Sequence, residues 1–131
     1  MIVLDTHVLV WWVSADPLLS KKAKAAIEHE IDGGEIVVSS ISAWEIAMLV
    51  QREKLLLSMS VARWLSSVAQ IETLRFHPVD TEVPVNSADL PGMFHKNPAD
   101  RMIVATARML NASLITRDEK IRAYEHVKTI W

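Results

Sequence analysis

Three short segments of the sequence, residues 2–4, 36–38 and 113–115, are almost wholly apolar, and stretches with helical spacing separate them. Strands that are apolar at every position are typical of a parallel sheet covered by helices on both faces. Two further segments, residues 72–77 and 127–130, alternate polar and apolar residues, as strands at the edge of a sheet can. Strands that alternate with helices therefore predict an α/β fold.

The character of each strand also predicts its place in the sheet. The three apolar strands should be central, and the two alternating strands should lie outside them. Right-handed crossovers are then satisfied by the strand order 3-2-1-4-5. We expect a three-layer α/β/α sandwich with a central parallel sheet of four to five strands, and a single domain over residues 1–131. Ligands of such sheets bind beyond the carboxyl ends of the strands where the order reverses, which here is between strands 1 and 4.

Local signals mark where several helices begin. Asn97 and Pro98 are typical of the cap and the first residue of a helix, which should run to about residue 110. Ser39 and Ser40 are candidate caps for a helix that continues to about residue 49.

The composition excludes several classes of protein. Half of the residues are apolar and only eight are Gly or Pro, so the chain is neither disordered nor collagen-like. The absence of Cys excludes disulfides, thiolate zinc sites and cysteine nucleophiles. We expect a cytoplasmic protein without membrane association, because no signal peptide or long apolar segment is present. The net charge of −2 argues against a general polyanion binder, although residues 96–131 carry seven basic residues against four acidic ones.

Four acidic residues stand where the expected fold would bring them together. Asp5 ends the first strand, Asp118 follows the fourth, and Asp100 is the third residue of its helix. Glu45 lies about one turn into the apolar helix after the second strand. Each acid alone has an ordinary structural explanation. Asp5 and Asp118 could cap helices, Asp100 could satisfy a helix N-terminus, and Glu45 could form a buried salt bridge with an arginine.

Carboxylates that lie close together raise one another's pKa, and they stay ionised together only around a cation. Oxygen ligands without Cys or paired His favour Mg²⁺ or Mn²⁺ over zinc, and the five His residues show no metal-binding spacing. An acidic Mg²⁺ site can hold phosphate oxygens and activate water for in-line attack. The four acids therefore indicate phosphodiester or phosphoryl chemistry.

Four motifs, in this order, resemble those of PIN-domain ribonucleases, specifically toxins of the VapC type: LDTHVLVWW, SSISAWEIAMLVQREKL, LPGMFHKNPADRMIVATA and LITRDEKI. The resemblance spans essentially the whole chain. It implies a single PIN-like domain with Mg²⁺- or Mn²⁺-dependent endoribonuclease activity on an RNA substrate. It also implies inhibition by a cognate VapB-like antitoxin and a homodimer.

The resemblance also implies roles for individual residues. Four acids match the family's catalytic and metal-binding positions: Asp5, Glu45, Asp100 and Asp118. Thr6 and Thr116 fall where the family often has a small hydroxyl residue that can support the metal shell or its water. One departure is Asn97, which stands where many relatives carry Asp. Because Asn caps a helix as well as Asp does, we expect this to change local charge and to leave the chemistry unchanged.

Other residues near these motifs are candidates for binding. Basic residues close to the acids in sequence are candidate contacts for RNA phosphates: Lys96, Arg101, Arg117 and Lys120. Four tryptophans in apolar helices are expected in the core or at a dimer face: Trp11, Trp12, Trp44 and Trp64. Four apolar residues could form a groove for an antitoxin helix or belong to the core: Met48, Leu49, Leu55 and Leu56.

Three alternative functions compete with a toxin ribonuclease. A small Mg²⁺-dependent phosphatase of the haloacid-dehalogenase kind also begins with Asp after an apolar strand, but it needs a second Asp two residues later, where this chain has His7. A PIN-like binding module without catalysis is disfavoured because all four acids are present. A housekeeping PIN-type RNA-processing nuclease would share the site, and a short antitoxin gene directly upstream would distinguish a toxin from it.

Overall fold

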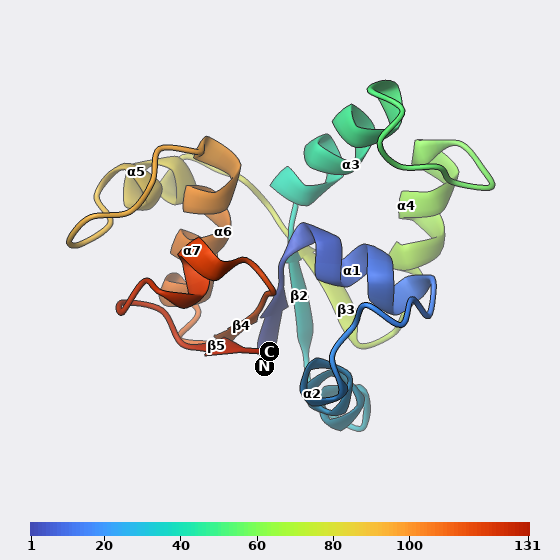
Figure 1. Ribbon diagram of the computed structural model, residues 1–131, viewed down its shortest axis with the longest axis horizontal. Coiled ribbons are helices and arrows are strands. Elements are labelled where there is room, and N and C mark those ends of the chain that lie inside the picture. Colours follow the sequence, from blue (N-terminus) through green and yellow to red (C-terminus); the bar gives the residue numbers. More distant parts are fainter.

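Five parallel strands form one sheet in the order β3-β2-β1-β4-β5 in the computed structural model, which describes residues 1–131 (Figure 1). The strands are β1 Ile2–Leu4, β2 Ile36–Ser39, β3 Leu74–His77, β4 Ser113–Ile115 and β5 Thr129–Ile130. At the centre of the sheet, Val3 of β1 pairs with Val37 of β2 and with Leu114 of β4. This confirms the predicted strand order and the central place of the three apolar strands.

Helices cover both faces of the sheet, which confirms the predicted three layers (Figure 1). The helices are α1 Thr6–Val13, α2 Lys21–Ile31, α3 Ile41–Gln51, α4 Val61–Ala69, α5 Glu82–Ala88, α6 Pro98–Met109 and α7 Glu119–Arg122. Helices α1, α3 and α4 lie on one side of the sheet, and α5, α6 and α7 on the other. None of these helices combines the length and the apolar character that crossing a membrane requires.

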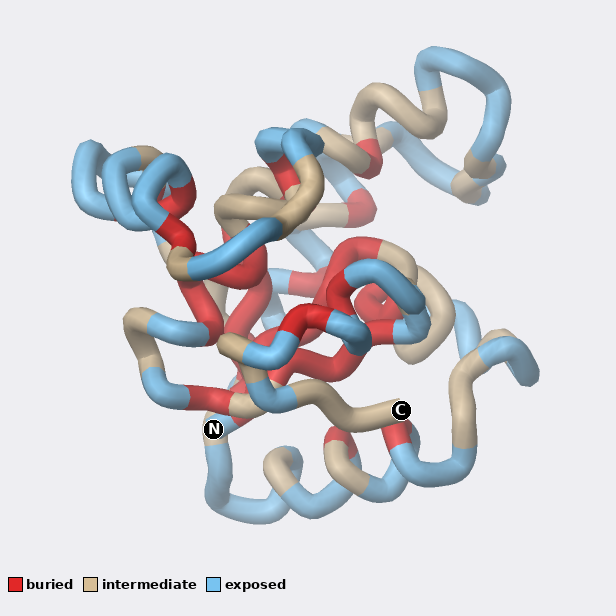
Figure 2. Tube along the Cα trace, turned by 60° about the vertical axis from the view of Figure 1, so that its left-hand side comes forward, coloured by how far each residue is buried: buried red, intermediate tan, exposed pale blue.

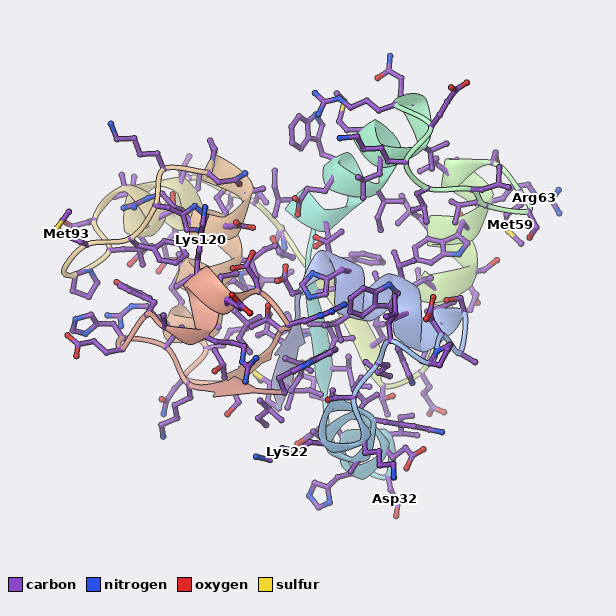
Figure 3. The ribbon with its side chains drawn as sticks, in the orientation of Figure 1. Lys22, Asp32, Met59, Arg63, Met93 and Lys120 are labelled. Atoms are coloured by element: carbon purple, nitrogen blue, oxygen red, sulfur yellow. The ribbon has the colours of Figure 1, made fainter.

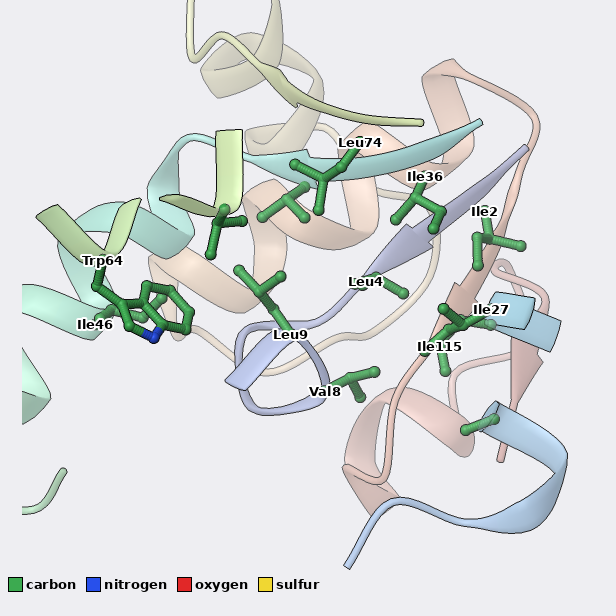
Figure 4. Close-up of a cluster of buried hydrophobic side chains, with 13 residues drawn as sticks. Ile2, Leu4, Val8, Leu9, Ile27, Ile36, Ile46, Trp64, Leu74 and Ile115 are labelled. Carbon is green, nitrogen blue, oxygen red and sulfur yellow. The ribbon is translucent and has the colours of Figure 1, made fainter. Parts of the chain in front are cut away.

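The side chains of the central strands alternate between two hydrophobic cores, because successive residues of a strand point to opposite faces. Ile2 and Leu4 of β1 enter the first core with residues of α1, α2, α3 and α4 (Figure 4). Val3, Val37 and Leu114 enter the second core with residues of α6. The buried residues accordingly gather along the strands and the inner sides of the helices (Figure 2). Burial on both faces explains why the central strands are apolar at almost every position.

The predicted helix starts are confirmed in part. The Asn97 side chain accepts a hydrogen bond from the Asp100 backbone N–H at 3.0 Å, and Pro98 is the first residue of α6. Ser40 occupies the cap position of α3, but its side chain makes no capping hydrogen bond. The prediction for Ser40 was therefore wrong. The hydroxyl of the preceding Ser39 accepts the Ile41 N–H at 3.3 Å instead.

The four tryptophans predicted in the core or at a dimer face have different environments. Trp64 is buried in the first core, and Trp12 is half-buried against it. Trp44 projects from α3 and is 56% exposed, so it is not a core residue. Trp11 belongs to neither core, and its ring lies near those of His7 and Trp131, with both planes tilted against it.

The four apolar residues considered for one antitoxin groove lie in separate places. Met48 and Leu49 line a cavity on α3, and Leu55 is half-buried against the first core. Leu56 is 95% exposed and lines a different cavity, near Trp64. These residues therefore lie at two separate cavities and, for Leu55, against the first core, and their part in an antitoxin groove stays a prediction.

The two-sided core predicts how the same substitution acts at two sites. Leu114 is fully buried in β4, so Leu114→Ala should lower the free energy of unfolding by about 2–5 kcal/mol through lost contacts and a cavity. The matched substitution Leu56→Ala, at an exposed position, should change it by less than about 0.5 kcal/mol. Urea denaturation followed by circular dichroism measures both. Similar effects at the two positions would contradict this packing.

Candidate active site

Asp5 is held in a fixed orientation between β1 and α1. The residue is only 3% exposed, and its carboxylate accepts two hydrogen bonds: from the Thr6 backbone N–H at 2.9 Å and from the Thr116 hydroxyl at 2.7 Å. Its own backbone N–H donates to the Ile115 carbonyl at 3.0 Å. The predicted capping contact is therefore present, and the same carboxylate is also tied to β4 across the point where the strand order reverses.

Glu45 joins this group through Thr6. The Thr6 hydroxyl donates to the Glu45 carboxylate at 2.6 Å and therefore accepts the hydrogen bond that it shares with the Ser42 hydroxyl at 2.8 Å. Glu45 forms no salt bridge, so the alternative of a buried pair with an arginine was wrong. Burial raises the pKa of Glu45, and the nearby charge of Asp5 adds to this effect while the Thr6 hydrogen bond opposes it.

Asp100 is the acid whose protonation the site perturbs most. Burial, which is the largest cause, and the charges of the other three candidate acids together raise the pKa of the Asp100 carboxyl to about 7, whereas the charge of Lys120 opposes this rise. These effects mean that the four predicted acids share one electrostatic environment at the carboxyl end of the sheet. The Asn97 side chain accepts the Asp100 backbone N–H, and no backbone N–H donates to the Asp100 carboxylate itself.

Asp118 is positioned by the start of α7. Its carboxylate accepts the backbone N–H groups of Lys120 and Ile121 at 2.8 and 3.1 Å, which confirms the predicted cap. Its own N–H donates to the Thr116 hydroxyl at 3.0 Å, and that hydroxyl donates to Asp5. Thr116 therefore links Asp118 to Asp5, as Thr6 links Glu45 to Asp5. A supporting role in a metal shell remains a prediction for both threonines.

Two histidines also face the acids, and sequence reasoning missed both. His95 Nδ1 accepts the Asn97 N–H at 3.4 Å, which leaves the ring proton on Nε2. This Nε2 is buried 3.2 Å from an Asp100 carboxylate oxygen, without the alignment of a hydrogen bond. The only signal in the sequence was the short separation between the two residues.

His7 stands in a similar relation to Asp5. Its Nε2 accepts the backbone N–H of Arg117 at 3.0 Å, so the ring proton lies on Nδ1, which is 3.6 Å from an Asp5 carboxylate oxygen. Because Arg117 is 110 positions away in the chain, no local pattern could reveal this contact.

The candidate phosphate contacts are not equivalent. Lys96, Arg117 and Lys120 are exposed, and Figure 3 shows Lys120 projecting from α7. Arg101 instead holds the loop before α6. Its guanidinium donates hydrogen bonds to four backbone carbonyl groups, those of Ser87, Ala88, Phe94 and His95. Arg101 is thus committed to this loop, and we do not retain it as a phosphate contact.

The acids have the donor chemistry of a divalent cation site. No three His, Cys, Asp or Glu side chains are arranged as shared ligands of one ion. Mg²⁺, however, is usually bound through one or two carboxylates and keeps several waters. The mutual repulsion that helps to raise the pKa of Asp100 is what a cation would offset. The carboxylates that could hold such an ion are Asp5, Glu45, Asp100 and Asp118.

Comparisons with known proteins agree with this fold. A sequence profile of the PIN domain matches residues 2–127. The chain is 36% identical to Ribonuclease VapC22 of Mycobacterium tuberculosis over 132 aligned residues, which cover 99% of this chain and 98% of the relative.

Solved structures share the same architecture. VapBC2 from Rickettsia felis, bound to a DNA fragment from its promoter, matches with a TM-score of 0.68 at 20% identity, over 98% of this chain and 97% of that one. FitAcB from Neisseria gonorrhoeae also gives a TM-score of 0.68, at 22% identity over 98% and 96% of the two chains. At these identities the structural likeness concerns the fold alone.

The pKa of Asp100 predicts a pH-dependent stability in metal-free buffer. The folded protein keeps this proton up to about pH 7, whereas the unfolded chain releases it near pH 4 (about its ordinary pKa), so ionisation destabilises the fold as pH rises between these values. Asp100→Asn removes this loss. Its melting temperature relative to the parent should therefore rise from pH 4 to pH 7 and stay higher above pH 7.

Calorimetry in the presence of EDTA, with Asp32→Asn as the control, measures this difference. Asp32 is exposed at the end of α2, so its variant should show no such trend. A melting temperature of Asp100→Asn that falls below that of the parent at pH 8 would contradict the electrostatic analysis.

Proposed function

The chain belongs to the PIN-domain family, as a member of the VapC type, and we propose that it is a Mg²⁺- or Mn²⁺-dependent endoribonuclease that acts as the toxin of a toxin–antitoxin pair. The observation that carries this proposal is the shared environment of four acids at the carboxyl end of the sheet. The relative at 36% identity is named a ribonuclease, which supports RNA as the substrate. Because the chain belongs to the PIN-domain family, the alternative of a haloacid-dehalogenase phosphatase is excluded.

The residues of the chain supply orientation and charge. Asp5, Glu45, Asp100 and Asp118 would hold the ion, which when bound supplies positive charge to phosphate oxygens and lowers the pKa of a bound water. Thr6 and Thr116 keep the carboxylates in place by donating to Glu45 and Asp5. Because free Asp100 holds a proton up to about pH 7, cation binding should release that proton and strengthen as pH rises through 7.

Exposed basic residues complete the substrate site in this proposal. Lys96, Arg117 and Lys120 would contact RNA phosphates on either side of the bond that is cut. These contacts would position the RNA without selecting its sequence, because phosphates are common to all nucleotides.

We also propose a VapB-like antitoxin as the partner, a homodimer as the assembly and the cytoplasm as the location. Support for the antitoxin comes from a solved structure of this fold described as a toxin–antitoxin complex from Klebsiella pneumoniae. For the homodimer, the supporting observation is the exposed Trp44 beside a cavity of about 440 Å³ that Met48 and Leu49 also line. Burial of this apolar surface would stabilise an assembly.

Substitution of Asp5 tests the catalytic proposal. Asp5→Asn keeps the volume of the side chain and an oxygen that can accept the Thr6 N–H, so the fold should persist. Asp5→Asn should abolish both the cleavage of single-stranded RNA and the growth arrest on expression. Addition of EDTA should abolish cleavage by the parent. After EDTA treatment, addition of Mg²⁺ or Mn²⁺ should restore cleavage by the parent but should not produce cleavage by Asp5→Asn. An Asp5→Asn protein that cuts RNA at the parental rate, beside an Asp32→Asn control, would refute the four-carboxylate site.

Glu45 separates a metal-binding role from a structural one. Glu45→Gln should relieve repulsion, so its melting temperature in EDTA should equal or exceed that of the parent. Mg²⁺ affinity, measured by calorimetric titration, should fall by at least about 10–100-fold. If Glu45 were structurally essential, the variant would instead lose stability equally in EDTA and in Mg²⁺.

A further inference from the structure

A second feature lies beside the candidate acids, on the side of β5. A cavity of about 390 Å³, which we call the Trp11 cavity, is lined by seven residues: His7, Trp11, Arg117, Asp118, Glu119, Arg122 and Trp131. It brings together α1, the residues after β4, α7 and the residue after β5. The proposed chemistry uses only one of these side chains as a ligand, that of Asp118.

Core packing does not account for the Trp11 ring in this cavity, whereas Trp131 also packs against the first core. Trp11 belongs to neither core and is only half-buried. Its ring centroid lies 6.0 Å from that of Trp131 and 4.9 Å from that of His7, with the planes tilted by 51° and 57°. Two tryptophans therefore present ring surface to a solvent-accessible cavity. Such rings are the platforms on which single-stranded bases stack.

Positive charge lies over the Trp11 ring and along the wall of the cavity. The guanidinium carbon of Arg117 is 5.7 Å from the centroid of the Trp11 ring, and Arg122 lines the cavity from α7. Both arginines are exposed, and neither forms a salt bridge. Their donors are therefore available to a ligand that carries both a flat apolar surface and a negative charge, as a nucleotide does.

The cavity adjoins the candidate active site. Asp118 lines the cavity and also contributes to the raised pKa of Asp100. His7 connects the two regions, because its ring contacts Trp11 while its Nδ1 lies 3.6 Å from Asp5. A nucleotide bound here would therefore be a neighbour of the phosphodiester group at the acids.

We propose that the Trp11 cavity is a nucleotide subsite, in which a base of single-stranded RNA stacks on Trp11 and Trp131 while Arg117 contacts its phosphate. This inference rests on the proposed ribonuclease function. It adds that the protein recognises a nucleotide next to the phosphodiester bond that is cut. It makes the base next to the scissile bond a source of binding energy. Stacking would accept any base, because every base has a π face.

The test compares cleavage of short single-stranded RNA by the parent and by variants in Mg²⁺. The variants are Trp11→Ala, Trp11→Phe, Arg117→Gln and, as a control at an exposed apolar position away from the acids, Leu56→Ala. Each substrate is also made with one abasic nucleotide, placed in turn at every position near the cut. Trp11→Ala should lower kcat/KM by roughly 5–100-fold, Trp11→Phe should lower it less, and Leu56→Ala should not change it.

The abasic series identifies the cause of that loss. At one position, removal of the base should weaken cleavage by the parent and have little effect on cleavage by Trp11→Ala, because the stacking partner is already absent. Arg117→Gln should lower kcat/KM on intact and abasic RNA alike, since it removes a phosphate contact. This exposed substitution keeps the test available if Trp11→Ala does not fold.

The possible failures are distinguishable. If the parent cuts RNA and the Trp11 and Arg117 variants cut every substrate equally well, the subsite is refuted while the ribonuclease function stands. If those variants keep full cleavage but lose binding to the antitoxin, the cavity is a protein contact and the inference is wrong. If the parent cuts no RNA under any metal condition, the proposed function fails, and the subsite fails with it.

Discussion

The Thr116 hydroxyl accepts the backbone N–H of Asp118 and donates to the carboxylate of Asp5, so one side chain fixes two acids that lie more than a hundred positions apart. Thr6 connects α3 to the same site, because its hydroxyl donates to the Glu45 carboxylate. The Thr6 hydrogen bond favours the ionised form of Glu45, whose pKa is raised by burial and by the charge of Asp5. The site thus keeps negative charge concentrated on one edge of the sheet.

The fold makes this concentration possible. Parallel strands end at the same edge, and β1 is followed by α1 after a single residue, which is Asp5. Helices α3 and α6 bring Glu45 and Asp100 toward that edge, and β4 leads into Asp118. Two cores on opposite faces hold the strands in register, so the carboxylates are positioned by well-packed elements. The unfavourable energy of the site is electrostatic, because burial and like charges raise the pKa of Asp100 to about 7.

The parts of this structure that follow periodicity and strand ends could be predicted from the sequence. The strand order followed from which segments were apolar at every position, and the four acids followed from their places after strands and in helices. Contacts between distant residues could not be predicted this way. His7 receives the N–H of Arg117, and Arg101 binds carbonyl groups of a loop whose path no local pattern specifies. Trp11 and Trp64 also look alike in sequence, but only Trp64 enters a core.

The central claim is that these acids bind a divalent cation together, and anomalous X-ray scattering from crystals grown with Mn²⁺ tests it most directly. The account predicts a Mn²⁺ peak at coordination distance from Asp5 and at least one more of the four acids, with waters completing the shell. The peak should be absent in crystals of Asp5→Asn. A parent protein that cleaves RNA with Mn²⁺ while its ion lies away from all four carboxylates would contradict the account.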